Sequence, residues 1–164
     1  MSAASVSASA SAVLAAALAV CAVPAFAASA APAAPAAAPS PPPPQLARFQ
    51  ADAGGTKVKD DKKNVNGEYL QVRNTSAKAI NVTGYWFRDT HGNRFVFPRG
   101  SVIGARTTVT VYTGVGTNRG AAFYWKQGFH KWNNTGDTAS LHSPKNVRLD
   151  VCTYKKNVAG FVSC

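Results

Sequence analysis

The stretch Lys131-Trp132-Asn133-Asn134-Thr135-Gly136-Asp137-Thr138-Ala139-Ser140-Leu141 decides the fold, because it joins a tightly constrained turn to a strand. Trp132 offers a large ring to bury. Asn133 and Asn134 tolerate left-handed backbone, and Gly136 supplies positive φ. Asp137 can accept hydrogen bonds from amides that the turn leaves free. The residues that follow alternate polar and apolar side chains, which predicts a half-buried strand.

The same period of two recurs on both sides of this turn. Leu70 and Val72 share one face of a strand after Gly67, and Val109 and Val111 lie inward between threonines. Two further apolar rows are predicted to face the core: Ile80, Val82 and Trp86, and Val147, Leu149 and Val151. No segment has helical periodicity. About seven short strands separated by turn residues predict an all-β fold, an immunoglobulin-like antiparallel β-sandwich.

The N-terminal region has a different composition and predicts export. No Lys, Arg, Asp, Glu or His precedes Arg48. An apolar run over 11–28 contains Ala25-Phe26-Ala27, which is typical of a signal peptide spanning 1–27 with cleavage after Ala27, although no charged residue precedes the run. An Ala-rich tail is the plainer alternative, and Pro24 argues against a membrane anchor. We therefore expect a secreted, extracellular or envelope-associated protein with no integral membrane span in the mature chain.

Residues 28–46 are Ala/Pro-rich, end in a run of four prolines at 41–44, and predict a disordered linker. The β-sandwich domain is then expected over 47–164. If cleavage removes Cys21, Cys152 and Cys164 remain, and in an oxidising compartment a pair bridges, the alternative being two free thiols. Because Cys152 lies opposite the row of Val147, Leu149 and Val151, this bridge is expected to pin the tail outside the last strand. It is not expected to be a buried bridge between sheets.

Three stretches together resemble the lamin-tail domain family in its secreted bacterial form. They are Gly67-Glu68-Tyr69-Leu70-Gln71-Val72-Arg73-Asn74, then Val82-Thr83-Gly84-Tyr85-Trp86-Phe87-Arg88-Asp89 with Gly92, and the stretch from Trp132 to Leu141. One departure is Ile103-Gly104-Ala105-Arg106, where the family tends to have a Pro-Gly turn. The resemblance implies an immunoglobulin-like sandwich that acts as a binding, anchoring or architectural module without catalytic residues of its own.

The residue types argue against catalysis. His91, His130 and His142 are far apart and lie in or beside expected turns, and Glu68 is the only glutamate. The sequence has no nucleophile elbow, no metal-spaced histidine pair and no phosphate-binding loop that opens a helix. We expect no enzyme, no cofactor and no metal. A secreted hydrolase that depends on His91 or His130 is the weaker alternative.

The charge favours binding to polyanions. The chain carries 18 Lys and Arg against 7 Asp and Glu, a formal net charge of +11. Such an excess attracts anionic polymers by counterion release. The candidate polyanion-binding residues are Arg119, Lys126, Lys131, Lys145, Arg148 and Trp125. The expected partner is an anionic cell-wall polymer or extracellular nucleic acid, and a protein-protein adhesion or assembly module is the alternative.

Overall fold

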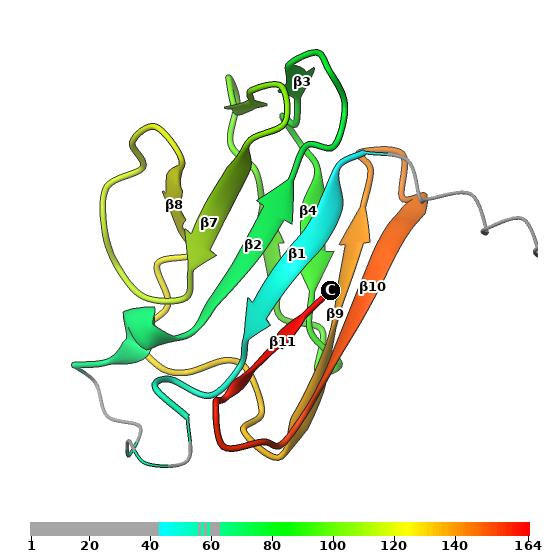
Figure 1. The fold of residues 1–164 in the computed structure, drawn as a ribbon. Helices are drawn as coiled ribbons and strands as arrows, with labels where there is room; N and C mark the ends of the chain where they lie inside the picture. Colours follow the sequence, from blue (N-terminus) through cyan, green and yellow to red (C-terminus); the bar gives the residue numbers. More distant parts are fainter. Residues whose placement is uncertain (1–42, 56, 58, 60–62) are drawn as a thin grey trace, which may run out of the picture. The chain divides into compact units, whose positions relative to one another are not determined.

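Two β-sheets face each other and enclose the core, as Figure 1 shows. The computed structural model describes residues 43–55, 57, 59 and 63–164. The predicted signal peptide 1–27 and nearly all of the linker 28–46 lie outside this range. The described strands are β1 (Gln45–Gln50), β2 (Tyr69–Arg73), β3 (Ile80–Asn81), β4 (Trp86–Arg88), β5 (Arg94–Val96), β6 (Val102–Ile103), β7 (Thr108–Tyr112), β8 (Ala122–Tyr124), β9 (Gly136–His142), β10 (Arg148–Lys155) and β11 (Phe161–Ser163), with one 3-10 helix, η1 (Val65–Gly67).

The strand order confirms an all-β, immunoglobulin-like sandwich. One sheet runs β11-β1-β2-β7-β8, the other runs β10-β9-β4-β5, and β3 pairs with β6 in a small two-stranded sheet. The described strands are more numerous than expected. One pairing is not antiparallel, because the loop after β7 carries the chain back so that β8 runs parallel to β7.

β1 begins at Gln45, inside the range expected for the linker. Leu46 and Phe49 are buried, and β1 pairs with β2 on one side and β11 on the other. A bulge between Leu46 and Arg48 breaks the alternation of the strand. This irregularity explains why a period-two pattern does not reveal the strand in the sequence.

The core is built from the alternating rows and from aromatic rings. Leu70, Val72, Val109 and Val111 are all buried, as the alternation predicts. Trp132 is 4% exposed, and its ring packs edge-on against Phe49 with centroids 4.4 Å apart. Burying one large apolar side chain contributes about 1.5–3 kcal/mol, so these rows hold the two sheets together.

Trp86 is buried, at 6% exposure, but it packs against Arg94 and His142 and not in the central core cluster, which corrects the expectation that it shares a face with Val82. Its neighbour Phe87 takes the core position and is fully buried. Val82 also points inward, but Gly84 adopts a φ of +74° between β3 and β4, and those two strands belong to different sheets. The alternation therefore does not carry across this turn, and Trp86 lies on the outer face of the four-stranded sheet.

The inward face of β10 is also the opposite of the one expected. A register shift between Arg148 and Asp150 inserts an extra residue, so Leu149 still packs against the core while Val151 is 44% exposed. After this bulge Cys152 and Tyr154 point inward and are buried. A one-residue shift exchanges the two faces of a strand, because side chains alternate.

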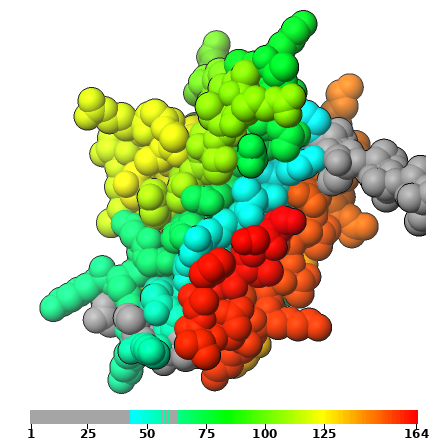
Figure 2. All heavy atoms as spheres, viewed as in Figure 1, coloured from blue at the N-terminus to red at the C-terminus, as the bar shows by residue number. Residues whose placement is uncertain are grey.

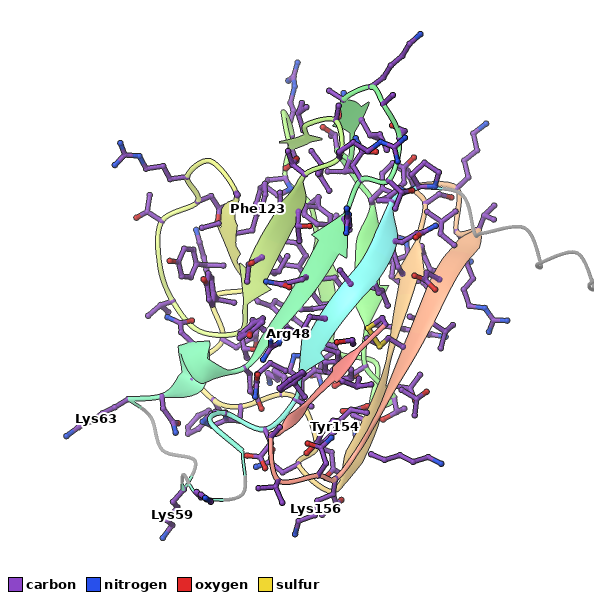
Figure 3. The ribbon with its side chains drawn as sticks, in the orientation of Figure 1. Arg48, Lys59, Lys63, Phe123, Tyr154 and Lys156 are labelled. Carbon is purple, nitrogen blue, oxygen red and sulfur yellow. A yellow bond between two sulfur atoms is a disulfide. The ribbon has the colours of Figure 1, made fainter. Side chains whose placement is uncertain are left out.

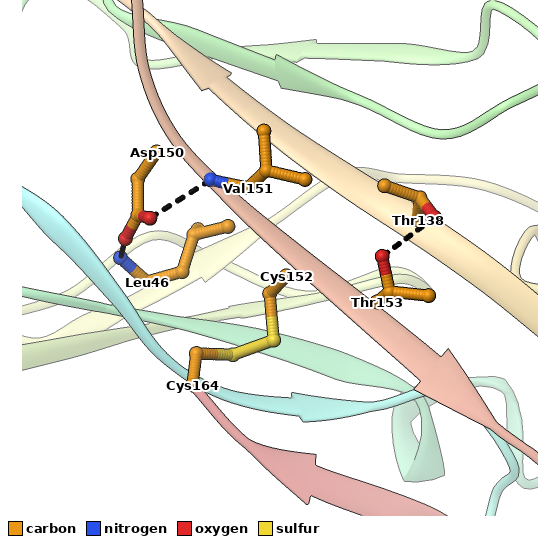
Figure 4. The surroundings of a disulfide bond; sticks show 7 residues. All are labelled: Leu46, Thr138, Asp150, Val151, Cys152, Thr153 and Cys164. Atoms are coloured by element: carbon orange, nitrogen blue, oxygen red, sulfur yellow. Dashed lines mark hydrogen bonds between the residues drawn. A yellow bond between two sulfur atoms is a disulfide. The ribbon is translucent and has the colours of Figure 1, made fainter.

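Cys152 and Cys164 form a disulfide, which Figure 4 shows close to Leu46 and Asp150. Cys152 belongs to the four-stranded sheet, and Cys164 follows β11 at the edge of the five-stranded sheet. The bridge therefore links the two sheets through an inward-facing Cys152, and does not pin the tail to an outer face. Figure 2 shows the C-terminal segment lying between β1 and β10, where this bridge closes one side of the sandwich.

Candidate functional site: a cationic sheet face

The described carboxylates point into the protein. Asp52, Glu68, Asp89 and Asp137 are each at most 4% exposed. Asp150 is half-buried and accepts hydrogen bonds from the amides of Leu46 and Val151, as Figure 4 shows. Asp60 and Asp61 lie outside the described residues. Among the described acids, each carboxylate thus accepts a hydrogen bond or forms an ion pair within the domain, and none belongs to an exposed residue.

Asp137 fixes the turn that decides the fold. Its Oδ1 accepts from the Thr90 amide, the Thr90 hydroxyl and the Thr138 amide, at 3.2, 2.7 and 2.7 Å. Its Oδ2 accepts from the Asn133 amide at 3.1 Å, and the Asn133 side chain accepts from Thr135. One buried carboxylate therefore ties the turn before β9 to the hairpin between β4 and β5.

Asp89, His91 and Asp137 bring potential metal ligands within 4.8 Å of one another. The hydrogen bonds explain this arrangement without a cation. Asp89 accepts from the His91 amide, the Asn93 amide and the Asn93 side chain. An ionised carboxylate offers about four acceptor positions, and Asp137 already accepts four hydrogen bonds. Asp89 and Asp137 are therefore hydrogen-bond acceptors that fix the turns around them.

His130 is tied to the only glutamate. Its Nδ1 lies 3.2 Å from Oε1 of Glu68, and its Nε2 lies 2.9 Å from Oδ1 of Asn64. Glu68 also accepts from the Lys131 amide at 2.9 Å. These contacts engage both ring nitrogens and attach the loop before Trp132 to the segment around η1. They are the contacts of a structural tie between these two segments.

Most described basic side chains are exposed. Figure 3 shows Lys59, Lys63 and Lys156 projecting from one end of the domain. The exposed members of the described set are Lys57, Lys59, Lys63, Arg73, Lys78, Arg88, Arg94, Arg99, Arg106, Arg119, Lys126, Lys145, Arg148, Lys155 and Lys156, while Arg48 and Lys131 are half-buried. Cations therefore dominate the described surface, since its carboxylates are turned inward.

The predicted polyanion-binding residues do not form one patch. Arg119 and Lys126 flank β8, whereas Lys145 and Arg148 belong to the hairpin between β9 and β10. The prediction that Trp125 contacts a polyanion is wrong. It is 9% exposed, packs edge-on against Phe87 at 5.4 Å, and its Nε1 donates to the Arg94 carbonyl at 3.0 Å. It is a core residue, so its ring cannot stack on a ligand.

Three arginines gather on the outer face of the four-stranded sheet. Arg88 lies opposite Arg94 on one side and Ser140 on the other, and Arg148 lies opposite His142. Residues directly opposite in paired strands point to the same face. We call this surface the cationic face and define it as Trp86, Arg88, Arg94, Thr138, Ser140, His142 and Arg148.

Trp86 organises the cationic face. The Arg94 guanidinium lies 4.0 Å from the centre of its ring, and the His142 ring stacks on it at 4.0 Å and 6°. Arg94 and His142 come from β5 and β9, which flank β4 on opposite sides. The indole is therefore held between a cation and an imidazole, an arrangement that cation–π attraction and ring stacking favour.

The electrostatics of His142 reflect its cationic neighbours. Burial lowers its pKa below 6.5, and the charges of Arg88, Arg148 and Arg94 lower the pKa further, against an opposing hydrogen bond with the Asn146 backbone. Burial disfavours the charged imidazolium most, and the nearby guanidinium groups disfavour it further because a cation repels a second cation. Arg88, Arg148, Thr138 and Ser140 also line one shallow depression, together with Asp89, Thr90, His91, Gly92 and Val151.

A family model described as Lamin Tail Domain matches residues 52–156, which is more than half of the chain. The chain belongs to the lamin-tail domain family. No curated protein sequence matches it significantly. Membership indicates an immunoglobulin-like binding or structural module. In the described part of this lamin-tail domain, no helix has the length and apolar character needed to cross a membrane.

Sequence reasoning missed the cationic face of the lamin-tail domain. Arg88 and Arg94 alternate with Phe87 and Phe95, which is a signal that two arginines share a solvated face. The row of Ile80, Val82 and Trp86 hides this signal, because it predicts Trp86 and not Phe87 at the core position. Which of two adjacent aromatic residues points inward depends on the pairing of β4 with β5 and β9, and the local pattern does not specify that pairing.

Proposed function

We propose that this lamin-tail domain is a secreted, non-catalytic binding and anchoring module that associates electrostatically with anionic envelope polymers or extracellular polyanions. One observation carries the proposal: within the described residues the carboxylates are engaged internally, while fifteen basic side chains are exposed. The excess positive charge, +11 for the whole chain, is therefore concentrated on the described surface, where a polyanion can approach it.

Counterion release supplies the driving force. A polymer that carries closely spaced charges condenses cations around itself, and a basic protein releases them when it binds. Affinity then falls steeply with salt. For duplex DNA, each phosphate that is neutralised makes the slope of the logarithm of the binding constant against the logarithm of the salt concentration more negative by roughly 0.9. The cationic face supplies three guanidinium groups to such a surface, and guanidinium pairs well with phosphate and sulfate.

The test is retention of the full chain on immobilised heparin, on DNA and on isolated cell walls across a salt series. We expect retention at about 50 mM salt and release as the concentration rises. The same matrix bearing dextran, which is uncharged, is the control. Absence of retention at low salt, or retention that salt does not change, would contradict the electrostatic proposal.

A protein-protein assembly module is the second candidate, and exposed apolar residues near strand edges favour it. Val96 on the terminal strand β5 is 45% exposed and Val102 on β6 is 52% exposed. An exposed edge can pair with another strand. Self-association that persists at high salt on size-exclusion chromatography would support this candidate, and a monomer under all conditions would count against it.

A further inference from the structure

We propose that Arg88, Arg148, Thr138 and Ser140 form a subsite for one tetrahedral dianion, a sulfate or phosphate ester group on a polymer, and that His142 couples its occupancy to protons. This inference rests on the proposed function, because it names the chemical group that the polyanion presents. It assigns a discrete site within the cationic face, where the proposed function requires only a general positive field.

The geometry gathers groups from three strands around one depression. Arg88 comes from β4, Thr138 and Ser140 come from β9, and Arg148 comes from β10. Ser140 lies at the centre, because its register partners are Arg88 on one side and Val151 on the other. β9 lies between β4 and β10, so Arg88 and Arg148 come from the two strands that flank the hydroxyl groups of Thr138 and Ser140.

This set of groups suits a tetrahedral dianion. A guanidinium presents parallel N–H donors at the spacing of two oxygens on phosphate or sulfate. The hydroxyl groups of Thr138 and Ser140 can each donate one further hydrogen bond, although they now contact Thr153 at 3.0 Å and His142 at 3.2 Å. Asp89 also lines the depression, but its carboxylate is engaged by the His91 and Asn93 amides of the turn.

His142 is placed to sense the charge of this subsite. Burial lowers the pKa of His142, and the positive charges of Arg88 on β4, Arg148 on β10 and Arg94 on β5 lower this pKa further. Its other neighbours are the Trp86 ring, the Ser140 hydroxyl and the Asn146 backbone. A dianion on Arg88 and Arg148 offsets their repulsion, so the imidazole then takes a proton more readily.

Proton and dianion binding must therefore favour each other. If a bound dianion raises the proton affinity of His142 by some factor, a proton on His142 raises the affinity for the dianion by the same factor. One added positive charge several ångströms from a dianion, in a largely aqueous setting, gives about a fivefold effect. We expect tighter binding at acidic pH than at alkaline pH.

Inorganic sulfate tests this inference on the full chain, because sulfate remains a dianion over the whole range used. Sulfate is titrated at pH 5 and pH 8 at constant ionic strength, and NMR follows the His142 ring and the Nε–H signals of Arg88 and Arg148. We expect saturable shifts confined to the cationic face, about fivefold tighter binding at pH 5, and a His142 pKa that rises with sulfate. Inorganic phosphate, a phosphorylated oligosaccharide and a sulfated oligosaccharide are then titrated in the same way. Their relative affinities show whether the subsite prefers phosphate esters or sulfate esters.

Matched variants locate the site. Arg88→Gln with Arg148→Gln should abolish the sulfate shifts, whereas Arg73→Gln with Arg106→Gln, which removes two exposed arginines elsewhere, should retain them. His142→Gln should lose most of the pH dependence of sulfate binding. His91 also lines the depression, so His91→Gln tests the competing source of the proton and should keep most of the pH dependence. Equal sulfate shifts in the two arginine pairs overturn the subsite. Loss of the pH dependence in His91→Gln with its retention in His142→Gln overturns the role of His142.

Failure of this inference differs from failure of the proposed function. If heparin still retains the chain in low salt but sulfate produces no localised shift, the subsite is wrong and the general electrostatic function stands. If sulfate shifts the cationic face but no polymer retains the chain, the subsite stands as a small-anion site and the polymer function is wrong. The His142 titration is read in the unmodified chain, so it does not depend on the folding of any variant.

Discussion

At the scale of single residues, a few buried polar side chains set the local structure. Asp137 accepts four hydrogen bonds from two turns, and Glu68 holds His130 and the Lys131 amide. A buried carboxylate is costly unless it is fully paired, so such residues fix one arrangement of the chain. On the outer face, His142 plays a different part, because burial and the surrounding arginines together lower its pKa.

The first prediction concerns the effect of His142 on how the free energy of unfolding changes with pH. Because the pKa of His142 in the folded chain is lower than 6.5, the unfolded chain binds a proton first as pH falls. Stability from this group is complete above the unfolded pKa and declines as pH falls below about 6.5. Urea unfolding from pH 8 to pH 5 should therefore show the wild type losing stability relative to His142→Gln. His91→Gln, in an exposed turn, is the control, and parallel profiles for wild type and His142→Gln would refute the prediction.

At the scale of elements, bulges and turns decide which side chains reach the core. The bulge in β10 turns Cys152 and Tyr154 inward and leaves Val151 exposed. This orientation makes the disulfide a link between sheets. β11 consists of three residues at the end of the five-stranded sheet and pairs with β1 alone, so the bridge adds a second covalent link to β10 beside the loop over 156–160.

The second prediction is that Cys164→Ser destabilises the domain by about 3 kcal/mol, the chain-entropy value for a loop of this length. The separation of 12 residues defines the loop that the bridge closes. Urea unfolding measures the loss, and hydrogen exchange should show reduced protection of the amides in β11. Reducing the wild type with dithiothreitol should reproduce the effect, and dithiothreitol should leave the variant unchanged. Full protection of β11 without the bridge would show that strand pairing alone holds it.

At the scale of the whole domain, the described surface and interior divide the charges between them. Aromatic and aliphatic side chains fill the space between the sheets. The described carboxylates accept hydrogen bonds or form ion pairs that fix turns and loops. The basic residues are left outside, and three of them meet on one sheet face. The proposed binding to polyanions therefore rests on how the fold distributes the charges as well as on the composition.

The third prediction compares two sets of arginine and lysine substitutions on heparin. Replacing Arg88, Arg94 and Arg148 together by Gln should lower the salt concentration needed for elution more than replacing Arg73, Lys78 and Arg106 together. Both triples remove the same formal charge, so composition alone predicts equal effects. The difference between the salt concentrations at which the two triples elute measures how much the clustering of arginines on the cationic face contributes to heparin binding. Identical elution of the two triples would show that heparin senses only the net charge.

The sequence alone determined the sandwich and its central rows. Leu70, Val72, Val109 and Val111 alternate without interruption, and the corner around Asn133, Gly136 and Asp137 contains residues whose chemistry suits one kind of turn. Such signals are local, so they can be read without knowing the partners of each strand. The excess of basic residues and the pair of C-terminal cysteines are equally plain in the sequence.

Only the tertiary structure decided which faces these residues occupy. The bulge before Asp150, the turn at Gly84 and the return of the chain into β8 each change a register, and register depends on strands distant in the sequence. In β10 a shift of one residue left Val151 exposed and brought Cys152 inward, and the turn at Gly84 placed Trp86 outside the central core cluster. The arginines of the cationic face come from β4, β5 and β10, so only the pairing of those strands through β9 could place them together.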